Sequence, residues 1–140
     1  MTEQTCCLIK PDAYPDAVHR IIKRLLGEGF RIRIAGTFIF NEEMIDAFYA
    51  EHIGKPYYDN LKTCMMEGPT FGMVLQRDNA IKHLRDLMGP AKIENRRCGQ
   101  IRYEYGSKTN VAKNAIHGSD SAESAWKEIE LVFQFIWFCA

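Results

Sequence analysis

Strand-like and helix-like segments alternate along this chain, and their order restricts the possible folds more than any other property of the sequence. The runs typical of strands fall at residues 5–10, 31–40, 70–76 and 129–133. The patterns typical of helices fall at residues 17–27, 42–51, near 57–66, 78–88 and 120–128, with a loop-rich stretch up to about 113. The order β-α-β followed by β-α-β predicts the α/β class, as an α+β sandwich of ferredoxin-like split βαβ topology. We expect a four-stranded antiparallel sheet covered by helices that lie on one side of it.

The chain has the size of one domain. Its 140 residues contain no internal repeat, low-complexity segment or long linker, so we expect a single domain over residues 1–140. Its 18 basic and 18 acidic side chains give a net charge of zero. A balanced chain lacks the excess positive charge that drives nonspecific nucleic-acid binding, and nucleic acid is not an expected partner. Lys92, Arg96 and Arg97 could form a small basic patch, or only a solvated loop beside a nucleotide cleft.

Cysteine usage and the chain ends indicate a cytoplasmic location. The five cysteines form no CxxC motif, and Cys6 and Cys7 point to opposite faces of a predicted strand, so we expect reduced thiols. Residues 1–4 lack the basic start of a secretory signal. No apolar run approaches the roughly 20 residues needed to cross a bilayer, so no membrane association is expected.

The C-terminal run, residues 131–140, is unusually apolar for a chain end. Its first part suits a closing strand. The remainder would be an aggregation hazard unless it docks on a groove or a second subunit. A homo-oligomer contact is the favoured interpretation, and docking on a membrane or another partner is the alternative.

The segment Asn114-Ala115-Ile116-His117-Gly118-Ser119-Asp120-Ser121 combines a lone imidazole with an unhindered glycine and small oxygen-bearing side chains. Asp120 as N-cap with Glu123 three residues later forms a capping-box pattern, which predicts that a helix begins here. The unpaired N–H groups of that first turn favour an anion by roughly 0.3–1 kcal/mol. The segment is therefore suited to phosphate chemistry.

His117 can act as a nucleophile in this setting if one ring nitrogen is free and an acceptor holds the other. Glu128 lies eleven residues later, where a returning helix could bring its carboxylate to the ring. The alternative is a loop histidine and a solvated glutamate, because spacing alone does not establish the contact. The glycine-rich loop GxxxxGK[ST] is absent, which excludes a P-loop kinase.

The segment Asn114–Ser121 with Glu128 resembles the active-site signature of the nucleoside diphosphate kinase family. Further blocks resemble that family in the same order, and the resemblance spans about residues 4 to 133. These blocks are Leu8-Ile9-Lys10-Pro11-Asp12, Phe48-Tyr49-Ala50-Glu51-His52, Gly54-Lys55-Pro56-Tyr57-Tyr58, Glu67-Gly68-Pro69, Arg85-Asp86-Leu87-Met88-Gly89-Pro90 and Ile101-Arg102.

The resemblance implies a ping-pong kinase that moves the γ-phosphoryl of a nucleoside triphosphate to His117 and then to a nucleoside diphosphate. It implies Mg²⁺ as cofactor, held mainly by the nucleotide, in keeping with a chain that lacks a metal motif such as HExxH. Loose phosphoryl transfer needs positioning and charge neutralisation, which lysine and arginine supply.

The implied site falls into two sets. The catalytic set is His117, Glu128, Lys10 and Ser119. The nucleotide-binding set is Lys10, Tyr49, Tyr57, Leu61, Arg85, Ala91, Arg102, Val111, Asn114 and Gly118. In this second set Tyr57 and Val111 would sandwich the base without reading its edges, which implies broad nucleotide tolerance. A second role is expected for Lys10 next to Tyr49. Without the resemblance, Tyr57 and Tyr58 would suit core aromatics, Arg85 a solvated helix face and Lys10 a strand edge.

The chain departs from the family pattern around the expected cleft. Ala91 stands where the family usually has a threonine, so a hydroxyl donor worth about 0.5–1.5 kcal/mol is missing. Residues 91–99 lack an expected proline, Gln100 replaces a usual threonine, and the stretch from Arg102 to His117 is about two residues longer than is common. Met88-Gly89-Pro90 and Tyr105-Gly106 resemble the divergent branch of the family, some members of which have weak or undetected kinase activity. The alternative function is therefore a nucleotide-binding or assembly module with little or no turnover.

Overall fold

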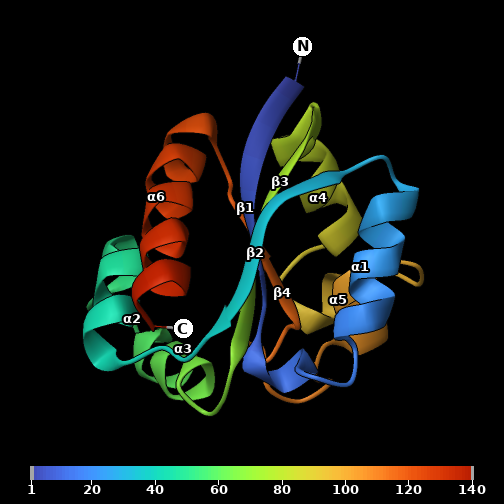
Figure 1. Cartoon of the computed structure of the whole chain (residues 1–140). Helices are drawn as coiled ribbons and strands as arrows, with labels where there is room; N and C mark the ends of the chain where they lie inside the picture. Colours follow the sequence, from blue (N-terminus) through green and yellow to red (C-terminus); the bar gives the residue numbers. More distant parts are fainter. Residues whose placement is uncertain (1, 140) are drawn as a thin grey trace.

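The computed structural model describes residues 2–139, and its elements surround one four-stranded sheet (Figure 1). The strands are β1 (Thr2–Ile9), β2 (Arg31–Phe38), β3 (Thr70–Asp78) and β4 (Ile116–Gly118). The α-helices are α1 (Val18–Gly27), α2 (Glu42–Phe48), α3 (Tyr58–Met65), α4 (Ala80–Met88), α5 (Ile101–Tyr105) and α6 (Ala122–Cys139). Short 3-10 turns are η1 (Pro11–Ala13), η2 (Ala50–His52) and η3 (Ile93–Asn95).

The strand order is β2-β3-β1-β4, and each neighbouring pair is antiparallel. β3 lies between β1 and β2, which are joined through α1, so the unit is a split βαβ. This confirms the predicted ferredoxin-like topology. β1 is an inner strand, and its partner β4 forms the edge at which His117 pairs with Leu8.

Helices cover both faces of the sheet, so the expectation that they lie on one side was wrong. Figure 1 shows α1, α4 and α5 on one side and α2, α3 and α6 on the other. Cys7 and Ile9 of β1 pack into the first core, whereas Cys6 and Leu8 pack into the second. A strand with a continuous apolar run must bury both faces, which is the physical reason for two layers of helix.

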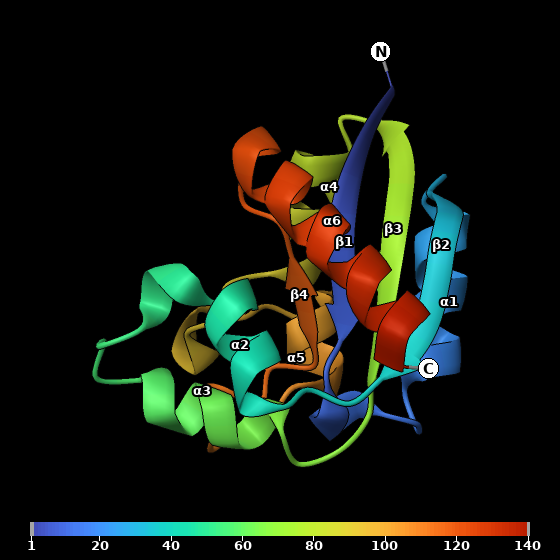
Figure 2. The same ribbon diagram turned by 60° about the vertical axis from the view of Figure 1, so that its left-hand side comes forward.

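The predicted strand at residues 129–133 is also wrong, because α6 continues as a helix through this region (Figure 2). Ala125, Val132 and Phe135 are buried at helical spacing. The helix lies close to the sheet: a Cβ added at Gly36 of β2 would come within 2.6 Å of Ile136. The fourth strand is instead the short β4, inside the segment that carries His117.

The N-cap of α6 lies one residue after the predicted one. Ser121 rather than Asp120 caps α6, because its hydroxyl accepts a 3.0 Å hydrogen bond from the N–H of Ser124. Serine and aspartate are equally good N-caps, so the sequence pattern did not separate them.

The helix predicted at residues 42–51 divides into α2 and η2, and the loop-rich stretch contains the short α5.

The C-terminal helix carries exposed aromatic rings. Trp126 and Trp137 are 79% and 72% exposed, and Phe133 stacks on Trp137. The remainder of the apolar run, at residues 138–140, lies beyond the described side chains. Within residues 2–139, none of the helices combines the length and apolar character needed to span a bilayer.

Candidate active site

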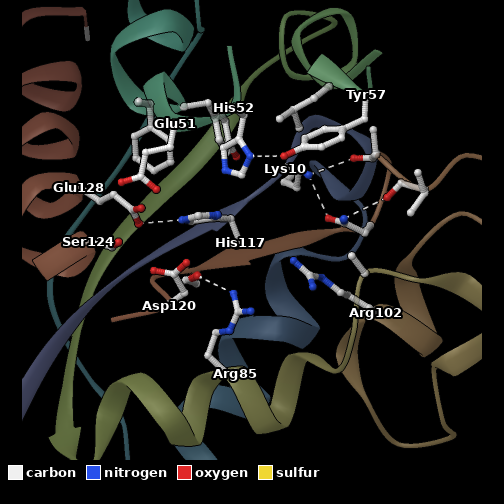
Figure 3. Close-up of a pocket in the computed structure, with 18 of the residues that line it drawn as sticks. Lys10, Glu51, His52, Tyr57, Arg85, Arg102, His117, Asp120, Ser124 and Glu128 are labelled. Carbon is white, nitrogen blue, oxygen red and sulfur yellow. Dashed lines mark hydrogen bonds and ion pairs between the residues drawn. The ribbon is translucent and has the colours of Figure 1, made fainter. Parts of the chain in front are cut away.

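A cavity of about 450 Å³ opens beside β4, between the α2–α3 segment and the start of α6. Figure 3 shows its basic, acidic and aromatic side chains converging from elements far apart in the sequence. It is lined by Lys10, Phe48, Tyr49, Glu51, His52, Tyr57, Leu61, Arg85, Ala91, Arg102, Val111, Ala112, Asn114, His117, Gly118, Asp120, Ser124, Lys127 and Glu128.

A turn that is hydrogen-bonded to the residues following β1 positions the strand that carries His117. Ala115 has a positive φ of 74°, which bends the chain into β4. Its N–H donates to the Asp12 carboxylate at 3.0 Å, and its carbonyl accepts the N–H of Lys10 at 2.9 Å. Such a left-handed residue is unfavourable unless its surroundings hold it. Two hydrogen bonds provide that support and fix His117 in register with Leu8.

His117 is held through one ring nitrogen. Its Nε2 lies 2.7 Å from Oε1 of Glu128, and the two side chains are 17% and 12% exposed. The Ser119 hydroxyl donates to the same carboxylate oxygen at 2.9 Å. Since a carboxylate accepts, this network assigns the ring proton to Nε2 and leaves the lone pair on Nδ1.

Ser119 is itself fixed by β1. Its N–H donates to the carbonyl of Cys6, and its hydroxyl accepts the N–H of Cys6, both at 3.2 Å. Ser119 is completely buried and does not belong to the cavity wall. It therefore connects the sheet to the carboxylate that orients the imidazole.

Lys10 lies at the end of β1 and is only 3% exposed. Its ammonium donates to the carbonyl of Ala112 at 3.0 Å and to Oδ1 of Asn114 at 2.9 Å. Burial, and next the nearby Arg102 guanidinium, lower the pKa of Lys10 to about 8. No hydrogen bond joins Lys10 to Tyr49 among the bonds described for residues 2–139, so its partner is the Asn114 segment instead.

Two arginines extend the positive end of the cavity. Arg102 donates to the carbonyl of Ile116 at 2.9 Å and to that of Gly89 at 3.1 Å. Burial, followed by the charge of Arg85, lowers the pKa of Arg102 to about 10. Arg85 donates to the carbonyl of Gly118 at 3.2 Å. These hydrogen-bond acceptors are neutral carbonyls, and the charge of Arg85 also interacts with the Asp120 carboxylate, which lines the same cavity.

The other end of the cavity is apolar and open. Tyr57 and Val111 are 45% and 42% exposed and line the cavity with Leu61. The Tyr57 hydroxyl is hydrogen-bonded to Nδ1 of His52 (Figure 3). Tyr58 is buried and bonds to Asp46 at 2.6 Å. The adjacent tyrosines thus have different environments: Tyr57 faces the cavity, and Tyr58 is a core residue.

Comparison with known proteins identifies the family. The profile described as nucleoside diphosphate kinase matches residues 3–136. The chain belongs to the nucleoside diphosphate kinase family. Proteins of that name from Actinobacillus pleuropneumoniae and Syntrophotalea carbinolica are 40% and 41% identical to this chain. The first alignment covers 95% of this chain and 96% of that protein, and the second covers 94% and 95%.

Solved nucleoside diphosphate kinase structures share the fold. The enzyme of Aquifex aeolicus superimposes with a TM-score of 0.89 at 36% identity, over 95% of this chain and 96% of that chain. The enzyme of Halobacterium salinarum, solved in complex with CDP, gives 0.87 at 32% identity, over 94% and 87%. The family and the phosphotransferase class expected from the sequence are therefore confirmed.

The structure brings the predicted set together. Of the residues assigned to nucleoside diphosphate kinase roles, all line the cavity except Ser119, which lies behind Glu128. Tyr49 is 6% exposed, and within residues 2–139 its hydroxyl has no hydrogen-bond partner. Burial above all raises the pKa of Tyr49, so the hydroxyl stays protonated and remains a donor.

Several residues that line the cavity were missed as site residues. Glu51 and His52 belong to a block that resembles the kinase family, yet only Tyr49 was selected from it. Ser124 and Lys127 line the cavity with Glu128. The helical spacing of these three along α6 was the signal that could have identified them.

Neither Asn95 nor Gln100 offsets the replacement at Ala91. Ala91 lines the cavity, whereas neither Asn95 nor Gln100 is among the described residues that do. The side-chain oxygen of Gln100 instead accepts the N–H of Arg97 at 2.7 Å. The missing hydroxyl is therefore not supplied by these side chains.

Neither the basic patch nor the fully solvated loop considered for Lys92, Arg96 and Arg97 is observed, because Arg96 is only 4% exposed. Lys92 and Arg97 are exposed, but Arg96 turns inward and donates to backbone carbonyls. Its guanidinium is a planar group with several donors, and burial lets it reach the carbonyls of Ala91 and Ser107 and, more weakly, that of Arg102 at the same time. The chain thus lacks a three-residue basic surface at this loop.

Proposed function

We propose that this chain transfers the γ-phosphoryl group of a nucleoside triphosphate to Nδ1 of His117 and then to a second nucleoside diphosphate. The observation that carries the proposal is the hydrogen bond between Nε2 of His117 and Glu128, since it leaves Nδ1 unprotonated beside a positively charged cavity. We also propose that residues 1–140 act as one domain.

In the first half-reaction, the Nδ1 lone pair forms a bond to the γ-phosphorus. The bond from that phosphorus to the β,γ-bridging oxygen breaks, and the electron pair leaves with the nucleoside diphosphate. The ring keeps its proton on Nε2 and gains positive charge, which the Glu128 carboxylate stabilises. The second half-reaction is the reverse, with a terminal oxygen of another diphosphate as the acceptor.

The positive end of the cavity supports the proposal electrostatically. Lys10, Arg85 and Arg102 hold their charges in place through hydrogen bonds to neutral acceptors. Phosphoryl transfer through a loose transition state depends mainly on such preorganised charge. The Tyr49 hydroxyl, which has no hydrogen-bond partner among the residues that the structure describes, is a further donor in the same cavity.

We propose Mg²⁺ as the cofactor, carried by the phosphates of the nucleotide. Within residues 2–139, no cluster of three histidine, cysteine or acidic residues is arranged to hold a metal ion. Glu51 and Asp120 line the cavity, and one or two carboxylates together with phosphate oxygens suit Mg²⁺. Bound there, Mg²⁺ would neutralise charge on the phosphates.

The proposed substrates are nucleoside di- and triphosphates with little discrimination among bases. A relative from Halobacterium salinarum is known in complex with CDP. In this chain, Tyr57, Leu61 and Val111 offer mainly apolar contacts to a base. We further propose a cytoplasmic homo-oligomer, for which the exposed rings of Trp126 and Trp137 supply an apolar contact surface.

Phosphorylation by γ-labelled ATP with Mg²⁺ tests the proposal. We expect acid-labile label on the wild type, no label on His117→Ala, and loss of the label when GDP is added. Since the ring acts on the transferring group, His117→Ala should keep most of its nucleotide affinity.

The second candidate function is nucleotide binding without turnover, and the absent hydroxyl at Ala91 favours it. Tight binding of ATP with persistent absence of label would establish this second function and refute the kinase. Shuttling of label by His117→Ala would show that the covalent mechanism is wrong.

A further inference from the structure

Arg96 is a buried cation whose guanidinium joins three separate backbone segments. Nη2 donates to the carbonyl of Ala91 at 2.8 Å. Nη1 donates to the carbonyl of Ser107 at 2.9 Å and, more weakly, to that of Arg102 at 3.4 Å. One side chain therefore connects the segment before η3, helix α5 and the loop at residues 106–113.

Each connected segment contributes to the cavity wall. Ala91 and Arg102 line the positive end directly. The N–H of Ser107 donates to the carbonyl of Lys113 at 2.7 Å. This hydrogen bond closes the loop that carries Val111 and Ala112, which line the apolar end of the cavity. Arg96 thus connects the two ends of the cleft, although it does not belong to the described residues that line it.

The fold makes room for this guanidinium at Gly106. A Cβ added there would come within 2.7 Å of Nη1 of Arg96 and 2.5 Å of the Arg102 carbonyl. Carbon atoms do not approach that closely without displacement of one partner. Glycine at position 106 is therefore a condition for the hydrogen bonds of Arg96.

The charge of Arg96 adds to the positive end of the cleft. Burial lowers the pKa of Arg96, and the charge of Asp12 opposes that shift. The charge of Arg96 in turn makes a small addition to burial in lowering the pKa of Lys10 and of Arg102. A buried charge is costly unless hydrogen bonds and an opposite charge compensate for it. A bound phosphate would supply further opposite charge beside this group.

We propose that Arg96 is a positioning residue for the nucleotide, which holds Ala91, Arg102 and the loop at residues 106–113 at the separation that binding requires. The proposal rests on the proposed function, because it assumes that the nucleotide occupies this cleft. It predicts that Arg96 affects nucleotide binding without touching the nucleotide.

The test compares Arg96→Ala and Arg96→Lys with the matched control Arg97→Ala. Arg97 is exposed, and its guanidinium bonds only weakly to the carbonyls of Glu94 and Arg96. Loss of charged hydrogen bonds should raise KM for GDP and Kd for ADP about tenfold or more in Arg96→Ala. We expect kcat to change less than about threefold, because the groups around His117 are held separately.

A single ammonium cannot reproduce the planar fork, so Arg96→Lys should recover only part of the affinity. Millimolar guanidinium should lower the KM of Arg96→Ala and leave Arg97→Ala unchanged. A merely structural residue would not show this chemical rescue. Gly106→Ala keeps Arg96, but its Cβ would displace the Arg102 carbonyl and Nη1 of Arg96 from each other, so KM should rise in the same direction.

Unchanged KM and Kd in Arg96→Ala, with only a lower melting temperature, would overturn the proposal. If Arg96→Ala does not fold, normal KM and Kd in both Arg96→Lys and Gly106→Ala would overturn it equally. Failure of the proposed kinase function can be distinguished from failure of the Arg96 proposal. If the function fails, the wild type binds ADP but His117 acquires no label, and the Kd values of the variants still test the role of Arg96. Absence of ADP binding by the wild type would refute both.

Discussion

The two ends of the cleft are built differently. The proposed phosphate end lies around His117 and Lys10, and the proposed base end lies around Tyr57 and Val111. At the phosphate end, His117 lies on β4 and is hydrogen-bonded to Glu128 of α6. Lys10 follows β1 and is hydrogen-bonded to Asn114, which is 104 residues away in the sequence. At the base end, Tyr57 and Val111 lie outside the sheet and are nearly half exposed. A reacting group must be held within a fraction of an ångström, whereas an apolar platform for a flat ring tolerates displacement. The contrast supports the proposal that the sheet holds the reacting groups and that tolerance for different bases comes from the more open end.

The strongest test of this contrast is Glu128→Gln at the phosphate end. An amide cannot stabilise the positive charge on the ring as a carboxylate does, and a charged hydrogen bond is worth about 1.5–3 kcal/mol. We expect the single-turnover rate of His117 labelling to fall roughly 10- to 100-fold, with ATP affinity nearly unchanged. Glu130→Gln is the control, because Glu130 is exposed on the same helix. An equal loss in both variants would show that the hydrogen bond to His117 has no special role.

The pH dependence of binding gives the next largest effect. Lys10 has a pKa of about 8 in the free protein, and a bound phosphate favours its charged form. Affinity for ADP should therefore fall as pH rises through 8, with Kd about tenfold higher at pH 9 than at pH 7. Titration calorimetry at a series of pH values measures this change.

Two observations separate this effect from unfolding. Between pH 8 and 10.5 the folded protein binds fewer protons at Lys10 than the unfolded chain does. The contribution of Lys10 to the free energy of unfolding therefore increases with pH over this range, so weaker ADP binding at pH 9 is not explained by a loss of stability at this group. The Lys10→Met variant should bind ADP weakly at every pH and lose the pH dependence. A wild-type Kd that stays constant from pH 7 to 9 would contradict the predicted role of Lys10.

The smallest effect is expected at the base end, for Tyr57→Phe. This change removes the hydrogen bond to His52 but keeps the aromatic face. At a half-exposed position a neutral hydrogen bond contributes near the lower limit of about 0.5 kcal/mol, so KM should rise only about twofold. Measurements with ATP, GTP and CTP should give the same ratio. A change above tenfold, or one confined to a single base, would remove the contrast between the two ends.

The fold was largely predictable in segments where a periodic pattern of apolar residues extends over many positions. The helices α1 and α4 and the strand β3 fall within two residues of their predicted bounds, because their apolar residues repeat with a clear period. The error at residues 129–133 arose because valine and phenylalanine suit strands as well as buried helices. Contact of Ile136 with Gly36 shows what the local pattern could not: α6 packs flat across the sheet.

The candidate site was predictable in membership but not in geometry. Lys10, Arg85, Arg102 and His117 were selected from motifs, and the structure places them around one cavity. Arg96 was misread, because an arginine in a polar loop is normally solvated and its burial depends on carbonyls of three segments.

The amino-acid sequence alone was sufficient for the order of strands and helices as far as α4, for the family and for the chemical types at the site. Those properties are encoded locally, in periodicity and in short motifs. Tertiary structure was needed to assign the imidazole proton to Nε2, to bury Arg96, to separate Tyr57 from Tyr58 and to place helices on both faces of the sheet. Each of these depends on groups brought together from distant positions, such as Cys6 and Ser119, which are 113 residues apart. Hydrogen bonds of that range exist only after the chain has packed, so no local pattern contains them.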